Sequence, residues 1–343
     1  MPEMSTDVDG PLLDVRNLKI HIKSFEGLAE IIDDVCFNLN KKEVIALVGE
    51  TGCGKSLTAK AILGVLPSNA EVVGGEVLYK GVDLLKLSEH DWRSYRGKEL
   101  SMIPQNPMVS LNPLLTVGEQ LMDLICLQDQ PEIALLPYYI RRKKLKKEKK
   151  AYDKAIKILE DVALKPAERV MRSYPFQISG GMAQRVCIAM ALLGNPSLLV
   201  ADEPGTSLDV TISKVILDLL EQKIRDLGLS VIFITHNLAV ARRISQRILV
   251  MYAGNVVEVC DSDKIFAEPL HPYTIGLKKA IPTLIQKEMI SIRGRVPSYI
   301  NPPRGCRFNT RCDRVMDICK LEKPKLVNLE GNHLVACHLY NRR

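Results

Sequence analysis

The sequence of 343 residues lacks a long apolar run: no window approaches the roughly 18 consecutive apolar residues that a membrane-spanning helix needs. Its N-terminus, M-P-E-M-S-T-D-V-D-G, also lacks the basic region and the apolar core of a secretory signal. We therefore expect the chain to stay in the cytoplasm and to reach a membrane only through partner proteins.

The cysteine count gives little support to a disulfide framework. Its nine cysteines are an odd number. Five of them are scattered singly through the expected core, where buried free thiols are common: Cys36, Cys53, Cys126, Cys187 and Cys260. The cysteine pattern therefore argues against disulfides.

The composition is that of a soluble globular protein, with 46% hydrophobic and 25% charged residues. The length suits one large domain with a smaller appendage. Much of the net charge of +7 lies in residues 141–150, R-R-K-K-L-K-K-E-K-K. We interpret this run as a solvated helix or insertion, and an approach to anionic lipid or nucleic acid is the alternative.

Strands and helices alternate in the sequence. A β-branched run at residues 43–48 leads through a glycine-rich turn into a helical pattern at residues 55–66. The alternation returns later, with strands predicted at residues 198–201, 231–235 and 248–252 and helices at residues 210–227 and 238–244. This pattern predicts an α/β fold with a mostly parallel sheet covered on both faces.

Residues 105–185 are mainly helical in pattern, most clearly at 117–127 and 151–162, and are interpreted as a helical subdomain inserted in the α/β core. Beyond about residue 261 the chain is rich in proline and ends with four clustered cysteines. We predict a main domain at residues 11–260 and a C-terminal extension at 261–343.

A phosphate-binding loop is the strongest motif. Residues 49–56, G-E-T-G-C-G-K-S, fit G-x-x-x-x-G-K-[ST] between a strand and a helix. Glycines let backbone N–H groups surround the phosphates, while Lys55 should reach the β- and γ-phosphates and Ser56 should bind Mg²⁺. The predicted nucleotide-binding residues here are Gly49, Glu50, Thr51, Gly52, Cys53, Gly54, Lys55, Ser56 and Leu57.

A pair of carboxylates follows the apolar run at residues 198–201. Asp202 is placed to hold Mg²⁺, through water, and Glu203 is placed to polarise the attacking water. A solvated turn is the alternative for an Asp-Glu pair, but the apolar strand leading into it favours the catalytic interpretation.

Ser179, Gly180 and Gly181 open a predicted helix and offer a hydroxyl and bare backbone N–H groups to an anion. With the two motifs above, the segment I-S-G-G-M-A-Q-R resembles the signature motif of ABC ATPases, about twenty residues before the Asp-Glu pair, as in that family. In the family, the signature of one subunit closes over the γ-phosphate held by the other. The resemblance therefore implies a head-to-tail dimer with ATP at the interface.

Other elements of the family follow in the expected order. Gln105 resembles the Q-loop glutamine that approaches Mg²⁺ and senses the permease. Ser207 and Asp209 resemble the D-loop, and His236 resembles the switch histidine at the γ-phosphate. The family stacks adenine on an aromatic residue upstream of the phosphate loop, a place that Phe25 or Ile22 could occupy here.

The segments M-A-Q-R, I-A-M-A-L-L, M-Y-A-G and H-P-Y-T resemble the ATPase subunits of oligopeptide and dipeptide importers, over nearly the whole chain from about Leu13. Ala183, Gly205 and the basic run depart from that branch. The resemblance implies a partner ATPase subunit, expected to form a heterodimer, two permease subunits and an extracellular binding protein. It places the chain at the cytoplasmic face of the membrane, and oligosaccharide or nickel import is the alternative.

Four cysteines lie within the last part of the chain, spaced C-x5-C-x6-C-x17-C: Cys306, Cys312, Cys319 and Cys337. Four thiolates suit Zn²⁺ or an iron-sulfur cluster, and the spacing does not choose between them. The importer branch carries a similar set that holds a [4Fe-4S] cluster, which favours a structural cluster here, with Zn²⁺ or unligated thiols as alternatives.

Two other classes of function compete with the importer interpretation. A soluble ABC ATPase acting on nucleic acid would be supported only by the basic run, and such proteins usually carry two cassettes or a long coiled-coil insertion. A sensor protein would use the cysteines as its working site.

Overall fold

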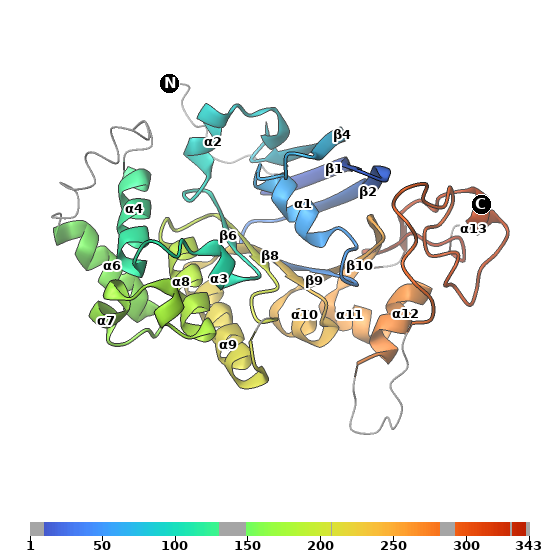
Figure 1. The fold of residues 1–343 in the computed structure, drawn as a ribbon. Coiled ribbons are helices and arrows are strands. Elements are labelled where there is room, and N and C mark those ends of the chain that lie inside the picture. The colour runs from blue at the N-terminus through green and yellow to red at the C-terminus, as the bar shows by residue number, and fades with distance from the viewer. Residues whose placement is uncertain (1–9, 130–148, 207, 282–291, 330, 341–343) are drawn as a thin grey trace. The chain divides into compact units, whose positions relative to one another are not determined.

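The computed structural model describes residues 10–129, 149–206, 208–281, 292–329 and 331–340 (Figure 1). The chain forms two compact units. The first unit comprises residues 1–86 and 232–343, and the second comprises residues 87–231. The predicted boundaries at 11–260 and 261–343 stay a prediction.

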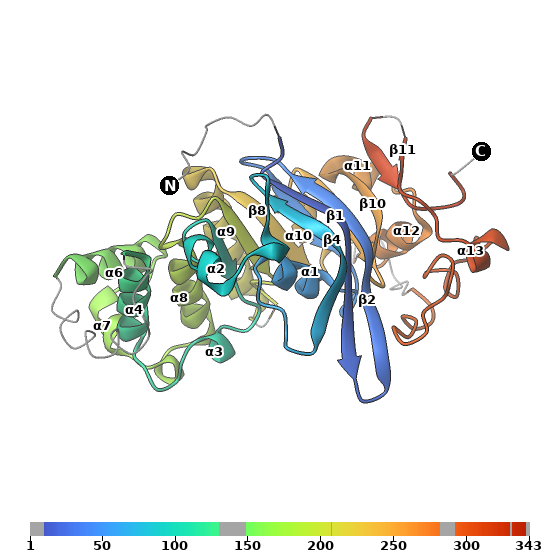
Figure 2. The same cartoon turned by 90° about the horizontal axis from the view of Figure 1, so that it is seen from above.

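An antiparallel sheet begins the first unit and is seen from above in Figure 2. Its strands run in the order β2-β1-β4-β5. Their bounds are β1 Leu13–Ser24, β2 Gly27–Leu39, β4 Ala70–Tyr79 and β5 Val82–Asp83. Buried positions alternate at the start of β1 and then shift at a bulge between Val15 and Leu18, so one face stays apolar along a bent strand.

A second sheet of the first unit carries the chain's phosphate-binding loop. β3 pairs in parallel with β9, β9 pairs antiparallel with β10, and β12 links β10 to β11. The bounds are β3 Val44–Val48, β8 Ser230–Thr235, β9 Arg247–Tyr252, β10 Asn255–Asp261, β11 Val327–Leu329 and β12 His333–Val335. All five residues of β3 are buried, which agrees with the apolar run seen in the sequence.

The helices of the first unit are short. Their bounds are α1 Lys55–Ile62, η1 Leu84–Lys86, α10 Leu238–Ile244, α11 Ser262–Ala267, α12 Pro272–Lys279 and α13 Ile318–Leu321. α12 and the chain after it pack on the second sheet through three aromatic rings. The centroid of Tyr252 lies 4.6 Å from that of Tyr273 and 5.0 Å from that of Phe308, so the C-terminal region shares the core of the first unit.

The second unit is mainly helical around two parallel strands, β6 and β7. Its elements are α2 Glu89–Tyr95, β6 Leu100–Ile103, α3 Pro107–Ser110, α4 Val117–Asp129, α6 Lys149–Asp161, α7 Ala167–Arg172, η2 Pro175–Gln177, α8 Gly180–Leu192, β7 Leu198–Asp202 and α9 Val210–Leu227. α4, α6 and α7 contact one another. The predicted helical subdomain therefore corresponds to a group of packed helices.

The predicted elements agree closely with these bounds, and the helix at 210–227 agrees at both ends. The helix predicted at 55–66 ends earlier, at Ile62, because Gly64 takes a left-handed conformation (φ 63°) that terminates it. Most of the basic run at 141–150 lies outside the described residues. Among the residues that are described, no helix has the length and apolarity to cross a membrane.

Candidate functional site

The loop between β3 and α1 has the backbone that a phosphate cradle needs. Gly52 and Gly54 have φ of 83° and 107°, a region that side-chain-bearing residues rarely adopt. At Gly49 a β-carbon would lie 2.1 Å from the carbonyl oxygen of Met251, so only glycine fits there. These three glycines are therefore dictated by the loop's shape.

Lys55 lies inside this loop and is almost fully buried, with 4% of its surface exposed. Its Nζ donates to the carbonyl oxygens of Gly49 and Glu50 at 2.8 and 3.1 Å. Such an ammonium group can exchange these neutral acceptors for phosphate oxygens, to which its hydrogen bonds are charge-assisted. Ser56 and Leu57 follow in the first turn of α1, half-buried, and Thr51 is exposed at the tip.

Cys53 is also buried in the loop, and burial raises the pKa of its thiol. The thiol therefore stays protonated at neutral pH, and its buried position indicates that the side chain serves in packing. A β-carbon at Gly49 would also lie only 2.7 Å from its sulfur.

Three side chains of the C-terminal region contact the phosphate-binding loop: Tyr273, Tyr299 and Arg311. Their local sequence marks none of them as a contact of the loop. Tyr273 lies in the segment H-P-Y-T, and no motif includes Tyr299 or Arg311. They are more than 200 residues away along the chain.

Asp202 ends β7 in the second unit and Glu203 directly follows it, as predicted, and both are buried. Glu203 adopts φ of 46°, an uncommon conformation for a non-glycine residue. The hydroxyl of Thr206 donates to the Glu203 carboxylate at 3.0 Å. A carboxylate held in this way can accept a proton from a nearby water molecule.

The predicted signature begins α8 of the second unit. Ser179 is the exposed N-cap, and its hydroxyl accepts from the backbone N–H of Met182 at 3.3 Å. A β-carbon at Gly181 would lie 2.7 Å from Cγ2 of Ile212 on α9. The serine is therefore presented to solvent at a helix start, and Gly181 is required by helix packing.

Two further predicted residues lie in the second unit. Gln105 is exposed after β6. Asp209 is the N-cap of α9 and accepts from the backbone N–H of Ile212 at 2.9 Å, so its carboxylate already has a local structural task. Ser207 lies outside the described residues.

Two other predicted residues lie in the first unit. His236 directly follows β8 and is exposed, which suits a residue that meets a ligand. Phe25 occupies the turn between β1 and β2 and is completely exposed. Its role in adenine binding stays a prediction, as do the roles of the other site residues.

Residues 32–206 match the family described as "ABC transporter". The oligopeptide transport ATP-binding protein AppD of Bacillus subtilis is 41% identical to this chain over 332 residues, which cover 96% of the chain and 97% of the relative. The chain belongs to the ABC transporter family.

Other relatives of this ABC protein agree. The oligopeptide transport ATP-binding protein OppD of Escherichia coli is 39% identical over 95% of the chain and 92% of the relative. A solved ATP-binding cassette, described as dimeric and bound to ADP and Pi, is 26% identical with a TM-score of 0.61 and covers 73% of this chain and 98% of its own. These matches confirm the α/β ABC fold and the assignment as an ABC-type ATPase that binds ATP.

The C-terminal part of this ABC protein has a match of its own. Residues 257–319 match the family described as "Oligopeptide/dipeptide transporter, C-terminal region". This match includes three of the four clustered cysteines and the three residues that contact the phosphate-binding loop.

The four clustered cysteines share one neighbourhood of the first unit. Burial is the main cause that raises the pKa of Cys306 to about 12, and the neighbouring Cys319, Cys337 and Cys312 contribute to the same shift. Yet in the parts of the chain that the structure describes, no group of three or more His, Cys, Asp or Glu residues is arranged to hold a metal ion. The geometry therefore does not support the predicted cluster.

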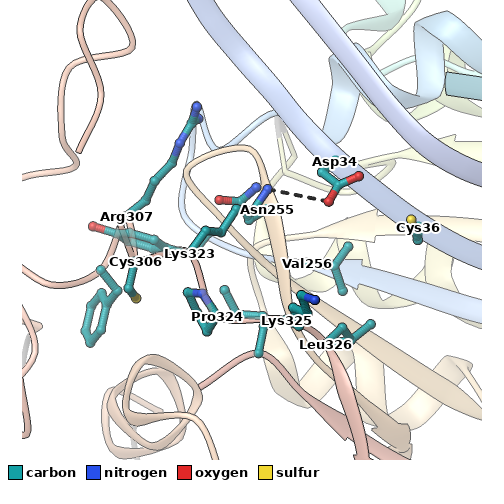
Figure 3. A pocket seen from close by; sticks show the side chains of 14 residues that line it. Asp34, Cys36, Asn255, Val256, Cys306, Arg307, Lys323, Pro324, Lys325 and Leu326 are labelled. Carbon is teal, nitrogen blue, oxygen red and sulfur yellow. Dashed lines mark ion pairs between the residues drawn. The ribbon is translucent and has the colours of Figure 1, made fainter. Parts of the chain in front are cut away.

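A pocket of about 500 Å³ includes Cys306 in its lining, which comes from β2, β10 and the C-terminal region (Figure 3). Its cations already have acceptors. Lys323 donates to the Asp33 carboxylate at 2.9 Å and lies 3.9 Å from that of Asp34, the pair drawn dashed. Arg307 donates to the carbonyl oxygens of Glu30 and Ala253. These hydrogen bonds and those of Lys323 attach the C-terminal region to β2.

Proposed function

We propose that this chain is the ATP-hydrolysing subunit that powers import of oligopeptides or dipeptides through a membrane permease. The observation that carries the proposal is the full-length similarity to AppD and OppD, which extends through the C-terminal region at residues 257–319. AppD and OppD are named as oligopeptide transport ATP-binding proteins. Similarity confined to the cassette would support only the ATPase.

The ATP chemistry follows from the predicted residues. Lys55 binds the β- and γ-phosphates, and Glu203 accepts a proton from the attacking water as it approaches the γ-phosphate. His236 contacts the γ-phosphate. Ser56 and Gln105 would hold Mg²⁺, with Asp202 acting through water, and the ion would neutralise phosphate charge.

The signature Ser179-Gly180-Gly181 acts on ATP bound by a second ATPase subunit, which we propose to be a different chain. The exposed side chain of Ser179 at the start of α8 supports this, because a helix N-terminus with an accessible hydroxyl suits an anion. Closure of the dimer on ATP would reorient the permease, and hydrolysis would reset it.

Two permease subunits and, through them, an extracellular binding protein complete the proposed assembly at the cytoplasmic face of the membrane. Apolar side chains just after Gln105 support a contact with the permease. Met108, Val109 and Leu114 are 42%, 81% and 82% exposed, which is costly for a surface without a partner.

We also propose that Cys306, Cys312, Cys319 and Cys337 hold a metal centre, a [4Fe-4S] cluster or Zn²⁺, that pins the C-terminal region. Their mutual effect on the pKa of Cys306 supports the idea that they lie near one another. No step of ATP hydrolysis is assigned to this centre.

The test is coexpression with the products of neighbouring genes, purification and reconstitution in lipid vesicles. We expect copurification with a permease and a second ATPase subunit, and ATP hydrolysis that rises with peptide. If nickel or an oligosaccharide stimulates ATP hydrolysis instead of peptide, that compound replaces peptide as the proposed cargo. A chain that ignores membranes and binds nucleic acid would overturn the importer proposal.

Replacing Glu203 by Gln tests the general base. We expect hydrolysis to fall about 100-fold or more, because the amide cannot take the proton from water, while ATP stays bound in a closed dimer. Glu268→Gln, an exposed change in the first unit, is the control. Rapid hydrolysis by Glu203→Gln would remove Glu203 from its assigned role.

A further inference from the structure

The phosphate-binding loop is held from outside by three side chains of the C-terminal region. The backbone N–H of Glu50 donates to the Tyr273 hydroxyl at 2.8 Å. The Tyr299 hydroxyl donates to the carbonyl oxygen of Gly52 at 2.7 Å. Arg311 binds the Glu50 carboxylate with two parallel hydrogen bonds of 2.9 and 3.1 Å. All of these contacts lie within the first unit.

Arg311 is fully committed to this position. Its side chain is 4% exposed, and acceptors match all five of its N–H donors. Besides the two oxygens of Glu50, they are the carbonyl oxygens of Ile292 and Arg293 and the hydroxyl of Tyr252. A buried guanidinium with every donor satisfied has one preferred geometry, so it fixes the direction of the Glu50 carboxylate.

The charge of Glu50 makes this contact relevant to ATP. Glu50 is the second residue of a loop whose N–H groups are built to surround phosphates. An unpaired carboxylate there would repel the anionic triphosphate and would compete for the same N–H groups. The bidentate pair with Arg311 neutralises this charge and turns the carboxylate toward the C-terminal region.

The two tyrosines add backbone restraints at neighbouring positions. Burial raises the pKa of both phenols, so each hydroxyl keeps its proton. Tyr299 also accepts from the backbone N–H of Glu30 through its own carbonyl oxygen at 2.8 Å, which ties it to β2. The loop is therefore braced at Glu50 and Gly52, on either side of its tip.

We propose that Arg311, with Tyr299 and Tyr273, is a positioning residue for nucleotide binding: the C-terminal region holds the phosphate-binding loop in shape and cancels the charge of Glu50. The proposal rests on the proposed ATPase function and adds a task for the C-terminal region within it. The alternative is a purely structural role, in which Arg311 stabilises the C-terminal region through its hydrogen bonds to Ile292 and Arg293 and has no effect on nucleotide binding.

The experiment separates these roles with a charge-compensated pair. Equilibrium binding of Mg-ATP and its steady-state hydrolysis are measured on the full chain carrying Arg311→Gln, Glu50→Gln or both. Arg311→Gln should weaken ATP binding about tenfold or more, because it leaves the half-buried Glu50 carboxylate unpaired beside the phosphates, while kcat changes less than KM. The double variant should regain wild-type affinity to within about threefold, because no unpaired carboxylate remains.

Two further variants sharpen the readout. Arg311→Lys keeps the charge but loses the two-pronged geometry, so its affinity should lie between those of wild type and Arg311→Gln. Arg304→Gln removes an exposed arginine of the same region and should leave affinity unchanged. If Arg311→Gln does not fold, Tyr299→Phe replaces it, with an expected loss of about threefold in affinity for one neutral hydrogen bond.

The outcomes are distinct. If neither Arg311→Gln nor Tyr299→Phe alters ATP affinity, or if Glu50→Gln fails to rescue Arg311→Gln, the positioning role is wrong. If the wild-type chain binds Mg-ATP without hydrolysing it in its assembly, the proposed function fails, while the affinities still decide the positioning role.

Discussion

At the scale of single residues, His271 is a buried titratable group with a measurable effect on stability. It is 1% exposed, and its Nδ1 accepts from the backbone N–H of Tyr273 at the start of α12. Burial lowers the pKa of His271 to about 4, and the nearby Glu258 carboxylate offsets only part of that effect. The folded chain therefore keeps this imidazole neutral where an unfolded chain would protonate it.

This shift predicts a pH dependence of the free energy of unfolding. The stabilisation is complete above the unfolded pKa of about 6.5 and is lost as the pH falls toward 4, by about 3 kcal/mol in total. Denaturant unfolding between pH 7 and pH 4.5 measures the slope. Above pH 4.5, carboxylates with lowered pKa such as Asp33 and Glu258 contribute little.

His271→Asn is the matched variant, because its side chain can still accept from the Tyr273 N–H at the helix start but does not titrate. It should be less stable overall yet show a shallower slope between pH 6.5 and pH 4.5. Equal slopes in the two proteins would contradict the assignment to His271.

At the scale of elements, the contact between α8 and α9 depends on one glycine. Gly181→Ala would ordinarily stabilise a helix by about 0.5–1 kcal/mol. Here the new β-carbon would meet Ile212 at 2.7 Å, so we expect a net loss of about 2 kcal/mol from overpacking. Thermal unfolding measures it.

Gly180→Ala is the control, since its β-carbon would meet only the end of the Leu208 side chain, at 3.3 Å. Adding Ile212→Ala to Gly181→Ala should restore part of the lost stability by removing the clashing atoms. A Gly181→Ala protein as stable as wild type would show that α9 yields at little cost.

Local sequence predicted most elements well because local chemistry sets their ends. α9 starts at the N-cap Asp209 and stops at Gly228 in a left-handed conformation (φ 60°), both readable from the sequence. The long strands β1 and β2 were not predicted. Their alternation is interrupted at a bulge beside Asn17, whose φ is 47°, so no clean period of two appears.

In the candidate site, too, some residues could be predicted from the local sequence and others could not. The glycines of residues 49–54 and the carboxylates after β7 stand beside elements that fix them, so their places followed from the sequence. The contact between Glu50 and Arg311 spans 261 residues and leaves no local pattern. Long-range pairs of this kind require the fold itself.

At the scale of the whole molecule, the C-terminal region is the part that distinguishes this chain from a bare cassette, because residues 257–319 match a family of their own, outside the 32–206 that match the ABC transporter family. If its four clustered cysteines hold a metal centre, replacing Cys319 by Ser should remove iron or zinc and make the region more sensitive to protease. Loss of a structural centre removes binding energy that also stabilises the fold.

Metal analysis and limited proteolysis of the purified chain test this. Cys36→Ser, a half-buried cysteine of β2 outside the set, is the control and should leave metal content unchanged. Anaerobically purified wild-type protein without iron or zinc would leave the four thiols as packing residues.

The distance in sequence between Glu50 and Arg311 also has a meaning in time. Their 261-residue separation, at the roughly 5–20 residues per second of protein synthesis, means that the loop is made about 13–50 seconds before Arg311. During that interval the loop carboxylate has no guanidinium to meet. A nascent or prematurely terminated chain would therefore compete poorly for cellular ATP, and full nucleotide binding would be reserved for chains whose synthesis has reached the C-terminal region.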